Sequence, residues 1–167
     1  LFLIYGENEG LKEDLILEFS KDYSKENTFK YSEKEIFLNL ENFYNNIFSQ
    51  SFFEKKKLII VNNTTEKVRS EIELILTKNI EDVTIVFLSS ILEKKSRLRN
   101  LFEKEKDLIC VAVYKDDHRV LFNFANSFFR SKKISISTES INLIIERSSE
   151  DRKNLRNELK KIDCFIG

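Results

Sequence analysis

Apolar runs of strand length alternate along the first two thirds of the chain with longer segments of helical periodicity. Most of the runs are nearly continuous, which is typical of parallel strands that helices cover on both faces. Their alternation predicts an α/β fold with a doubly wound, parallel sheet of five strands. The five runs are Leu1–Tyr5, Thr28–Tyr31, Lys57–Val61, Val83–Leu88 and Leu108–Val113.

The segments between these runs repeat their apolar residues at the 3.6-residue period of amphipathic helices. Ser32 and Glu35 stand at capping-box spacing, which marks the start of the second of these helical stripes. The predicted stripes are Leu11, Leu15, Ile16 and Phe19; Ile36, Leu40, Phe43 and Ile47; Val68, Ile72 and Ile75; and Leu98, Leu101 and Phe102.

The last third of the chain has a helical pattern. Three apolar stripes follow in turn: the first helix opens at Asp116-Asp117, Ser137 and Ser140 surround the start of the second, and Asp151 opens the third, all residue types that are suited to helix starts. We therefore predict an α/β domain over residues 1–115 and a small three-helix lid domain over residues 116–167.

The charges of the chain balance. Lysine and arginine number 28, and aspartate and glutamate also number 28, so the formal net charge is zero. This balance argues against a protein whose main affinity comes from neutralising phosphates, although a local basic patch is compatible with it. Charged residues make up 34% of the chain and hydrophobic residues 41%, which fits a folded domain with a charged surface.

Several features predict a cytoplasmic protein with no membrane partner. No apolar run approaches the roughly 20 residues that span a bilayer, and no basic-then-apolar leader precedes the first run. Cys110 and Cys164 lack CxxC spacing, and with His118 as the only histidine they are too few to form a metal site, so we expect reduced thiols. Because the chain begins on a strand without Met and stops at the end of a helix, we expect it to be a piece of a longer protein.

A sheet followed by a helical lid resembles the plan of the AAA+ nucleotide-hydrolysing modules. Their phosphate loop needs glycines followed by Lys and Ser/Thr, but this chain has carboxylates at Glu7 and Glu9 and places Glu13 where the hydroxyl belongs. After the fourth run, Ser89-Ser90 stands in place of the paired acids that hold magnesium. We predict no nucleotide cofactor and no catalytic residue. The alternative is a nucleotide hydrolase whose phosphate site uses unusual residues.

Two adjacent aromatic residues, Phe52 and Phe53, lie in a polar and charged stretch just before the third strand. A core element spaces its aromatic residues by its own period, so at least one of these rings should point outward. The pair fits an exposed anchor for another protein. Alternatively, it closes the end of a helix onto the core.

Four segments on this architecture resemble the delta subunit of the bacterial DNA polymerase III clamp loader, over essentially the whole chain. They are Tyr5–Leu11 at the first turn, Ser51–Phe53 before the third strand, Leu92–Arg99 after the fourth strand, and Asp151–Leu159 in the lid. The resemblance implies a non-hydrolysing, AAA+-like subunit that binds the ring-shaped sliding clamp (the beta subunit) and opens it for loading onto DNA during replication. The family's third domain, a helical collar, is not in this chain.

In that family a small polar residue followed by two large hydrophobic residues grips the clamp. Ser51, Phe52 and Phe53 match this element, and Gln50 stands where some relatives carry another apolar anchor. The implied partners are the sliding clamp and the other clamp-loader subunits, with DNA contacted indirectly or weakly. The alternative is a scaffold subunit that only holds other loader subunits together.

A dense basic cluster follows the fourth strand, at the carboxyl side of the predicted sheet. Open α/β sheets bind ligands at that edge. The cluster is therefore a candidate for a DNA or subunit contact, and it consists of Lys94, Lys95, Arg97 and Arg99.

Overall fold

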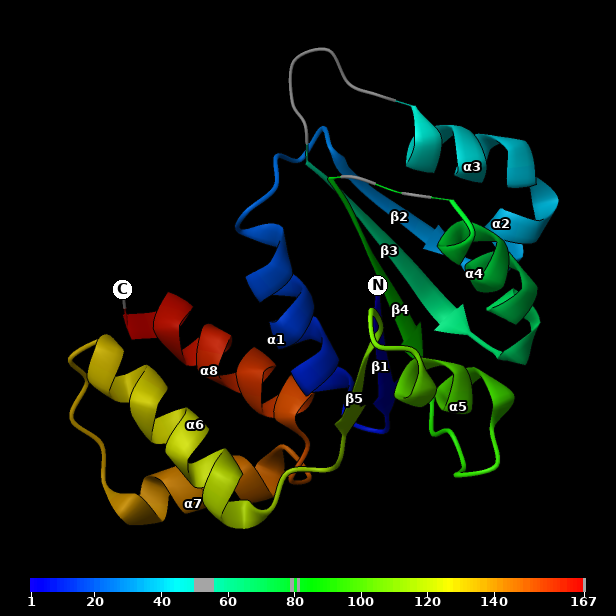
Figure 1. Cartoon of the computed structure of the whole chain (residues 1–167). Helices are drawn as coiled ribbons and strands as arrows, with labels where there is room; N and C mark the ends of the chain where they lie inside the picture. The colour runs from blue at the N-terminus through cyan, green and yellow to red at the C-terminus, as the bar shows by residue number, and fades with distance from the viewer. Residues whose placement is uncertain (50–55, 79, 81, 167) are drawn as a thin grey trace. The chain divides into compact units, whose positions relative to one another are not determined.

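The computed structural model describes residues 1–49, 56–78, 80 and 82–166. In this part of the chain it contains five strands, eight α-helices and one 3₁₀ helix (Figure 1). In chain order they are β1 (Phe2–Gly6), α1 (Glu9–Ser20), β2 (Thr28–Ser32), α2 (Glu33–Leu38), α3 (Leu40–Phe48), β3 (Lys57–Thr64), η1 (Glu66–Val68), α4 (Arg69–Leu76), β4 (Val83–Ser89), α5 (Arg97–Lys104), β5 (Ile109–Val113), α6 (His118–Ser131), α7 (Thr138–Arg147) and α8 (Arg152–Ile166).

The chain forms two compact units. The first comprises Leu1–Gly6 and Leu15–Ala112, and the second comprises Glu7–Asp14 and Val113–Gly167. The division falls inside α1, because the first turns of this helix make their contacts with the second unit. The first turns of α1 are therefore part of the unit that contains α6, α7 and α8.

The five strands form one sheet in the order β2-β3-β4-β1-β5. β3 pairs in parallel with β2 and with β4, and β4 pairs in parallel with β1. In the middle of the sheet, all four residues of Leu58–Val61 are buried, as expected for a strand that is covered on both faces. The predicted five-stranded parallel sheet is thus confirmed.

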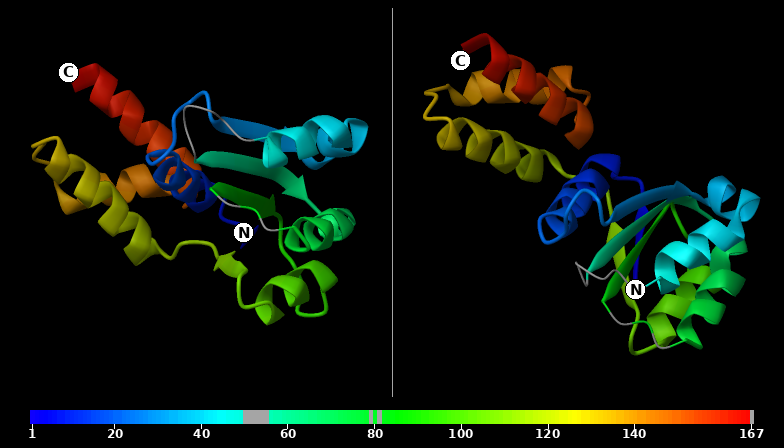
Figure 2. Two further views of the ribbon diagram at one scale, coloured as in Figure 1. Left: turned by 45° about the horizontal axis from the view of Figure 1, so that its top comes forward. Right: turned by 90° about the horizontal axis from the view of Figure 1, so that it is seen from above.

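Alternate residues of each strand face opposite sides of the sheet. Leu3, Ile59 and Phe87 share a core cluster with side chains of α2, α3, α4 and α5, which cover one face (Figures 1 and 2). On the other face, Phe2 meets Phe19 of α1 edge to face, with 4.7 Å between the ring centroids. The sheet is therefore covered by helices on both sides, as the sequence predicts.

The predicted stripe from Ile36 to Ile47 is divided between two helices. Ser32 caps α2 in the expected capping box, in which the Glu35 carboxylate accepts the Ser32 N–H at 2.6 Å. Asn39 then leaves the helical conformation, with φ −148° and ψ 73°, and its side chain caps α3. The apolar face continues across the break because Ile36 and Ile47 are both buried.

The three helices α6, α7 and α8 pack around a second core (Figure 2). Asp117 and Ser137 cap α6 and α7 through their side chains, and Asp151 accepts the N–H of the residue three positions on at 2.8 Å. The sequence placed these helix starts at Asp116-Asp117, at Ser137 and Ser140, and at Asp151, and the three capping residues are among them. The core consists of Leu121, Ala125, Phe129, Ile141, Ile145, Leu155 and Leu159.

Candidate functional site

The residues predicted to bind the clamp lie outside the part of the chain that the structure describes. The structure does describe the elements on either side: α3 ends at Phe48 with Ser49 as its C-cap, and β3 begins at Lys57. The predicted residues, which lie between these two elements in the sequence, are Gln50, Ser51, Phe52 and Phe53.

Lys57 joins these two flanking elements. Its side chain is buried, and its ammonium group donates hydrogen bonds to the Asn46 carbonyl at 3.1 Å, the Ser49 hydroxyl at 2.8 Å and the Ser49 carbonyl. A helix leaves its last carbonyl groups unpaired and carries partial negative charge at this end, so a cation is favourable there. Burial lowers the pKa of Lys57. The start of β3 is therefore fastened to the end of α3.

Within the predicted basic cluster, the Arg99 side chain is held by contacts with other side chains of the first unit. Its Nε lies 2.7 Å from the Glu103 carboxylate, and its guanidinium lies 5.2 Å from the centroid of the Tyr5 ring. The contact with Tyr5 connects α5 to β1, and the pair with Glu103 lies within α5. Arg99 is therefore positioned by the fold of the first unit, whatever partner the surface meets.

The other three residues of the cluster are exposed. Lys95 lies 2.9 Å from the Glu93 carboxylate, but exposed ion pairs of this kind contribute little free energy. Lys94 precedes it in the same loop, and Arg97 begins α5. These three cations present their charge to solvent at the carboxyl side of the sheet and remain candidates for a contact.

The same edge of the sheet has a switch point between β1 and β4. The chain leaves these two neighbouring strands in opposite directions along the sheet. From β1 it crosses toward β2 at one edge, and from β4 it crosses toward β5 at the other edge. Open α/β sheets bind ligands at such a point. Gly6 ends β1 there with a φ of 137°, which favours glycine, and its N–H donates to the Ser90 carbonyl at 3.2 Å. The buried Ser89 hydroxyl donates to the Thr64 carbonyl at 2.7 Å.

The N-terminus of α1, which follows this turn, is engaged inside the second unit. The Asn8 side chain accepts the N–H of Leu11 and donates to the Tyr114 carbonyl, both at 2.9 Å. Lys12 is buried and its ammonium group pairs with Glu9 at 2.7 Å. Groups that would otherwise be free to hold a phosphate at this helix start are therefore bonded to the chain itself.

Arg156 of α8 binds the first half of α1 through three acceptors. Its guanidinium lies 2.8 Å from the Glu13 carboxylate, 2.5 Å from the Asp14 carboxylate and 2.6 Å from the Gly10 carbonyl. Desolvation raises the pKa of Glu13, but the hydrogen bonds and positive charges of Lys153 and Arg156 outweigh it, so the pKa lies below its usual value. The network therefore favours the ionised carboxylate.

Arg152 adds a second connection between α8 and α1. Its guanidinium lies 2.7 Å from the Asp14 carboxylate and 3.1 Å from that of Asp116. The two backbones also approach closely: a Cβ atom on Gly10 would lie 2.7 Å from the backbone nitrogen of Lys153 and 2.8 Å from the Cβ of Arg152. Close packing and ion pairs together hold α8 against the first turns of α1.

A small hollow of about 220 Å³ adjoins this network. Pockets that bind small molecules and cofactors usually have about 300–1,000 Å³, and carboxylates outnumber cations in this lining by four to two, which disfavours phosphates. A hollow of this size and charge is unsuited to a nucleotide, and the absence of a nucleotide from the Gly6–Gly10 turn stays a prediction. The lining residues are Glu7, Asn8, Lys115, Asp116, Glu150, Asp151 and Arg152.

The sequence analysis missed an exposed apolar surface on α2. Phe37 is 40% exposed and Leu38 is 85% exposed, and they line an open hollow of about 660 Å³ with Glu33, Lys34 and Lys67. The clue was available, since two adjacent large apolar residues fall outside the buried stripe that begins at Ile36.

Among residues 1–49, 56–78, 80 and 82–166, no group of three or more His, Cys, Asp or Glu side chains could hold a metal ion. Cys110 and Cys164 are free, and burial raises the pKa of the Cys110 thiol. No helix in the described part of the chain has the length and apolar character needed to cross a membrane.

The five-stranded parallel sheet with its helices is an AAA+-like fold, similar to that of AAA+-type replication proteins. No protein-family model matches the chain, and no curated protein matches it in sequence. The likeness is therefore one of structure.

Three solved structures illustrate it. The DNA clamp loader delta protein (YqeN) of Bacillus subtilis matches with a TM-score of 0.67 and 15% identity, over 99% of this chain and 53% of that protein. The replication initiator DnaA bound to AMPPCP and single-stranded DNA matches with a TM-score of 0.61 and 16% identity, over 97% and 54%. Domain III of the Thermotoga maritima replication initiation protein DnaA matches with a TM-score of 0.54 and 16% identity, over 98% and 75%. The chain spans about half the length of the first two proteins.

Proposed function

We propose that this chain is a delta-type subunit of a bacterial clamp loader, cytoplasmic and without chemistry of its own, which binds the sliding clamp and opens it. The observation that carries the proposal is the Ser51-Phe52-Phe53 element, in a chain whose fold matches that of the Bacillus subtilis delta protein over 99% of its length. Phe52 and Phe53 are the anchors, and Ser51 and Gln50 flank them.

The flanks of this element support its use as an anchor. Ordering a loop on binding costs affinity, so an anchor works best on a fixed base. Lys57 fastens β3 to the end of α3, and at that end Phe48 stacks on Tyr44 with 5.8 Å between the ring centroids. The ammonium group of Lys78 lies 4.3 Å from the Phe48 ring centroid. In the sequence, the Ser51-Phe52-Phe53 element therefore lies between α3 and β3, and these contacts hold both of them in place.

The binding free energy that two phenylalanine rings can supply suits a subunit that acts without nucleotide. Two phenylalanine rings that enter a preformed pocket each remove several tens of Å² from water, at roughly 25 cal/mol per Å². A ring-shaped partner that fits the pair better when open is shifted toward its open form by the difference between the two binding free energies. Binding alone can therefore open an interface.

The engaged N-terminus of α1 supports a non-catalytic role over the hydrolase alternative. Isothermal titration with ATP and magnesium tests this part of the proposal. We expect no measurable heat of binding and no turnover. Tight binding with turnover would instead favour a nucleotide hydrolase with an unusual phosphate site.

The decisive experiment removes both anchors. Phe52→Ala plus Phe53→Ala is tested by biolayer interferometry against the sliding clamp encoded by the same genome. Because truncation of a hot-spot residue costs roughly 2 kcal/mol or more, we expect at least several hundredfold weaker binding. The melting temperature should stay nearly unchanged, since a buried Phe→Ala costs about 3–5 kcal/mol of stability and an exposed one costs little.

The matched control is Phe37→Ala plus Leu38→Ala, which removes two exposed apolar side chains from α2. It should leave clamp binding unchanged. Early melting of the Phe52 and Phe53 variant would mean that the rings belong to the core, and normal clamp binding by it would overturn the proposal. A wild-type chain that assembles with other loader subunits but does not bind the clamp would be a scaffold.

A further inference from the structure

The open hollow of about 660 Å³ beside α2 combines apolar and charged side chains. Phe37 and Leu38 supply its apolar part, and Lys34 and Lys67 supply two ammonium groups. The volume lies within the range of about 300–1,000 Å³ that is usual for sites that bury a ligand. Two large apolar side chains next to each other on an exposed helix end are typical of an interaction surface.

The two walls of this hollow are fixed to each other. α2 provides one wall, and Lys67 of η1 belongs to the other. The Glu33 carboxylate joins them, because it accepts the Thr65 N–H at 2.5 Å and the Thr65 hydroxyl at 2.8 Å. At the end of α2, the backbone N–H of Asn39 donates to two carbonyls of the helix, both at 3.2 Å. The hollow is therefore preformed, and a partner loses little affinity to the ordering of this surface.

The unpaired groups of the hollow favour an acidic partner. Lys34 and Lys67 are exposed, and their ammonium groups have no hydrogen bond or ion pair with any residue that the structure describes. The carboxylate in the lining, Glu33, is buried and bonded inside the chain. Glu35 accepts hydrogen bonds from the N-cap of α2, and Glu66 of η1 accepts them from the start of α5. Carboxylates of a partner therefore find two unpaired ammonium groups, whereas its cations find carboxylates that are already bonded.

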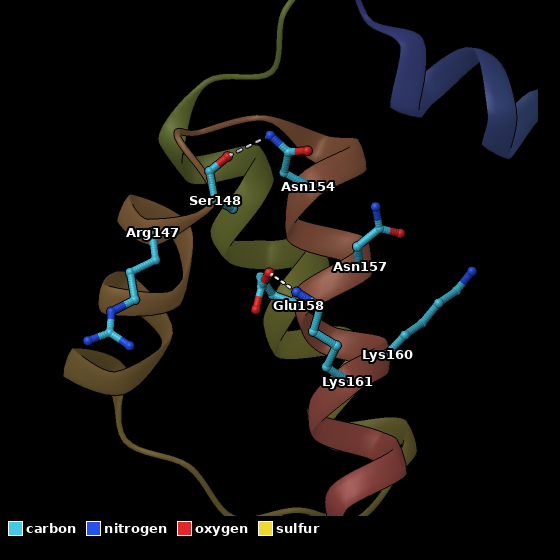
Figure 3. Close-up of a pocket in the computed structure, with 7 residues that line it drawn as sticks. All are labelled: Arg147, Ser148, Asn154, Asn157, Glu158, Lys160 and Lys161. Atoms are coloured by element: carbon cyan, nitrogen blue, oxygen red, sulfur yellow. Dashed lines mark hydrogen bonds and ion pairs between the residues drawn. The ribbon is translucent and has the colours of Figure 1, made fainter.

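The hollow between the end of α7 and α8 is of a different kind (Figure 3). Polar and charged side chains line it, and Figure 3 shows Arg147 and Lys160 pointing away from each other. Its carboxylate, Glu158, is paired with Lys161 at 2.7 Å. Of these two hollows, the one beside α2 alone offers apolar side chains together with unpaired cations.

We propose that the hollow beside α2 binds a short segment of another protein, one that carries large apolar side chains next to carboxylates. An amphipathic helix of this composition buries its apolar side chains against Phe37 and Leu38 and places carboxylates at Lys34 and Lys67. A second copy of this chain fits less well, because a two-fold interface here brings the same lysines of both copies together. This partner is distinct from the clamp, whose proposed anchors lie in another segment of the chain.

The test selects binders from a phage library of random peptides of about 16 residues, which is about four turns of helix. The library is panned on the wild-type chain and, in parallel, on the Phe37→Ala plus Leu38→Ala variant. We expect peptides that are enriched on the wild type alone. They should share large apolar residues at helical spacing and contain more Asp and Glu than Lys and Arg. The most enriched peptide is then labelled with fluorescein, and its affinity for each variant is measured by anisotropy.

The apolar pair should dominate the affinity. Phe37→Ala plus Leu38→Ala should weaken binding of the labelled peptide at least about 30-fold, which corresponds to the loss of one hot-spot residue. The matched control, Leu17→Ala plus Leu143→Ala, removes two exposed leucines outside the hollow and should change the affinity by less than about twofold. Circular dichroism melts check that each variant folds. Leu38→Ala alone serves if the double variant does not fold, and it should weaken binding at least about threefold.

The two lysines should contribute less to affinity and more to its salt dependence. Lys34→Gln plus Lys67→Gln should weaken binding roughly fivefold and flatten the dependence on salt, because exposed ion pairs are weak and screened. The control, Lys25→Gln plus Lys106→Gln, removes the same charge from exposed positions outside the hollow. It should leave both quantities nearly unchanged.

Four outcomes would overturn the proposal. The first is that no peptide is enriched on the wild type over the variant. The second is that the enriched peptides have no acidic excess or bind the lysine variant as well as the wild type. The third is that the wild type dimerises in analytical ultracentrifugation and the apolar variant does not, which would make a second copy the occupant. The fourth is that vesicles of phosphatidylcholine and phosphatidylglycerol bind the wild type but not the apolar variant, which would make the surface a membrane contact.

These measurements are separate from those that test the proposed function. The peptide affinities are obtained without the clamp, so a failure of the clamp-binding proposal leaves them unchanged. Conversely, the Phe37→Ala plus Leu38→Ala variant should lose the peptide and keep the clamp. Loss of clamp binding by this variant would make the hollow a part of the clamp site and would also overturn the inference of a separate partner.

Discussion

The two halves of α8 use basic side chains in opposite ways. In the first half, Arg152 and Arg156 are 14% and 12% exposed and are bonded to carboxylates that the same chain provides. In the second half, Lys160 is exposed and has no partner in the described residues. The comparison teaches that the number of cations on a helix says little about binding, because neighbours decide which of them are already neutralised.

The energetic consequences differ accordingly. A buried guanidinium that loses its carboxylates, or carboxylates that lose their guanidinium, leave a charge without compensation in a poorly solvated place. An exposed ammonium group keeps its hydration and costs little to remove. The first half of α8 should therefore matter more for stability than the second half.

The largest effect is expected from Arg156→Met. This change leaves Glu13, Asp14 and the Gly10 carbonyl without their shared donor, so we expect a loss of about 3 kcal/mol in the free energy of unfolding. Urea denaturation followed by circular dichroism measures it. Lys160→Met on the same helix should change stability by less than about 0.5 kcal/mol. Equal effects of the two substitutions would break the comparison.

A smaller loss is expected from Gly10→Ala. Alanine is favoured over glycine in a helix by about 1 kcal/mol, so a helix with free space here would gain stability. The new Cβ would instead lie 2.7 Å from the backbone nitrogen of Lys153, which cannot move like a flexible side chain. Overpacking should outweigh the gain and give a net loss of about 1–2 kcal/mol in urea denaturation. A more stable variant would show that α8 does not press against α1.

The smallest effect is expected from Glu13→Gln, and it should depend on pH. The pKa of Glu13 is lowered in the folded protein, so its ion pairs stabilise the fold above its unfolded pKa and lose this contribution as the pH falls through the folded value. Because the side chain is about half exposed, the difference from wild type at pH 7 should be below about 1 kcal/mol. It should shrink toward zero near pH 3. A difference that is constant between these pH values would rule out the ionic mechanism.

Much of the fold could be predicted from the sequence because the responsible interactions are local. Nearly continuous apolar runs indicate strands covered on both faces, and Ser32, Asp117 and Ser137 cap the helices that directly follow them. The break at Asn39 was missed, since the apolar stripe runs unbroken from α2 into α3 and hides a cap in its middle. Phe37 and Leu38, the exposed pair on α2, were missed because they stand within this unbroken apolar stretch of the sequence.

The candidate sites were less predictable. The clamp-binding role of Ser51, Phe52 and Phe53 stays a prediction from the sequence, because the structure does not describe these residues. The basic cluster after β4 was found from its density of charge, but its division into Arg99, which packs against Tyr5, and exposed neighbours was not. Counting charges cannot separate a cation held by the fold from one that faces water.

The sequence by itself determined the parallel sheet, the helix starts and the missing Ser/Thr of a phosphate loop, because each depends on residues that are neighbours in the chain. Only the tertiary structure decided that the arginines in the first half of α8 pair with carboxylates of α1, whereas Lys160 in its second half is exposed and has no partner in the described residues. Arg156 and Glu13 are 143 positions apart in the chain, yet their side chains meet at 2.8 Å. The strength of such a pair depends on distance and burial, and neither quantity is written in the order of the residues.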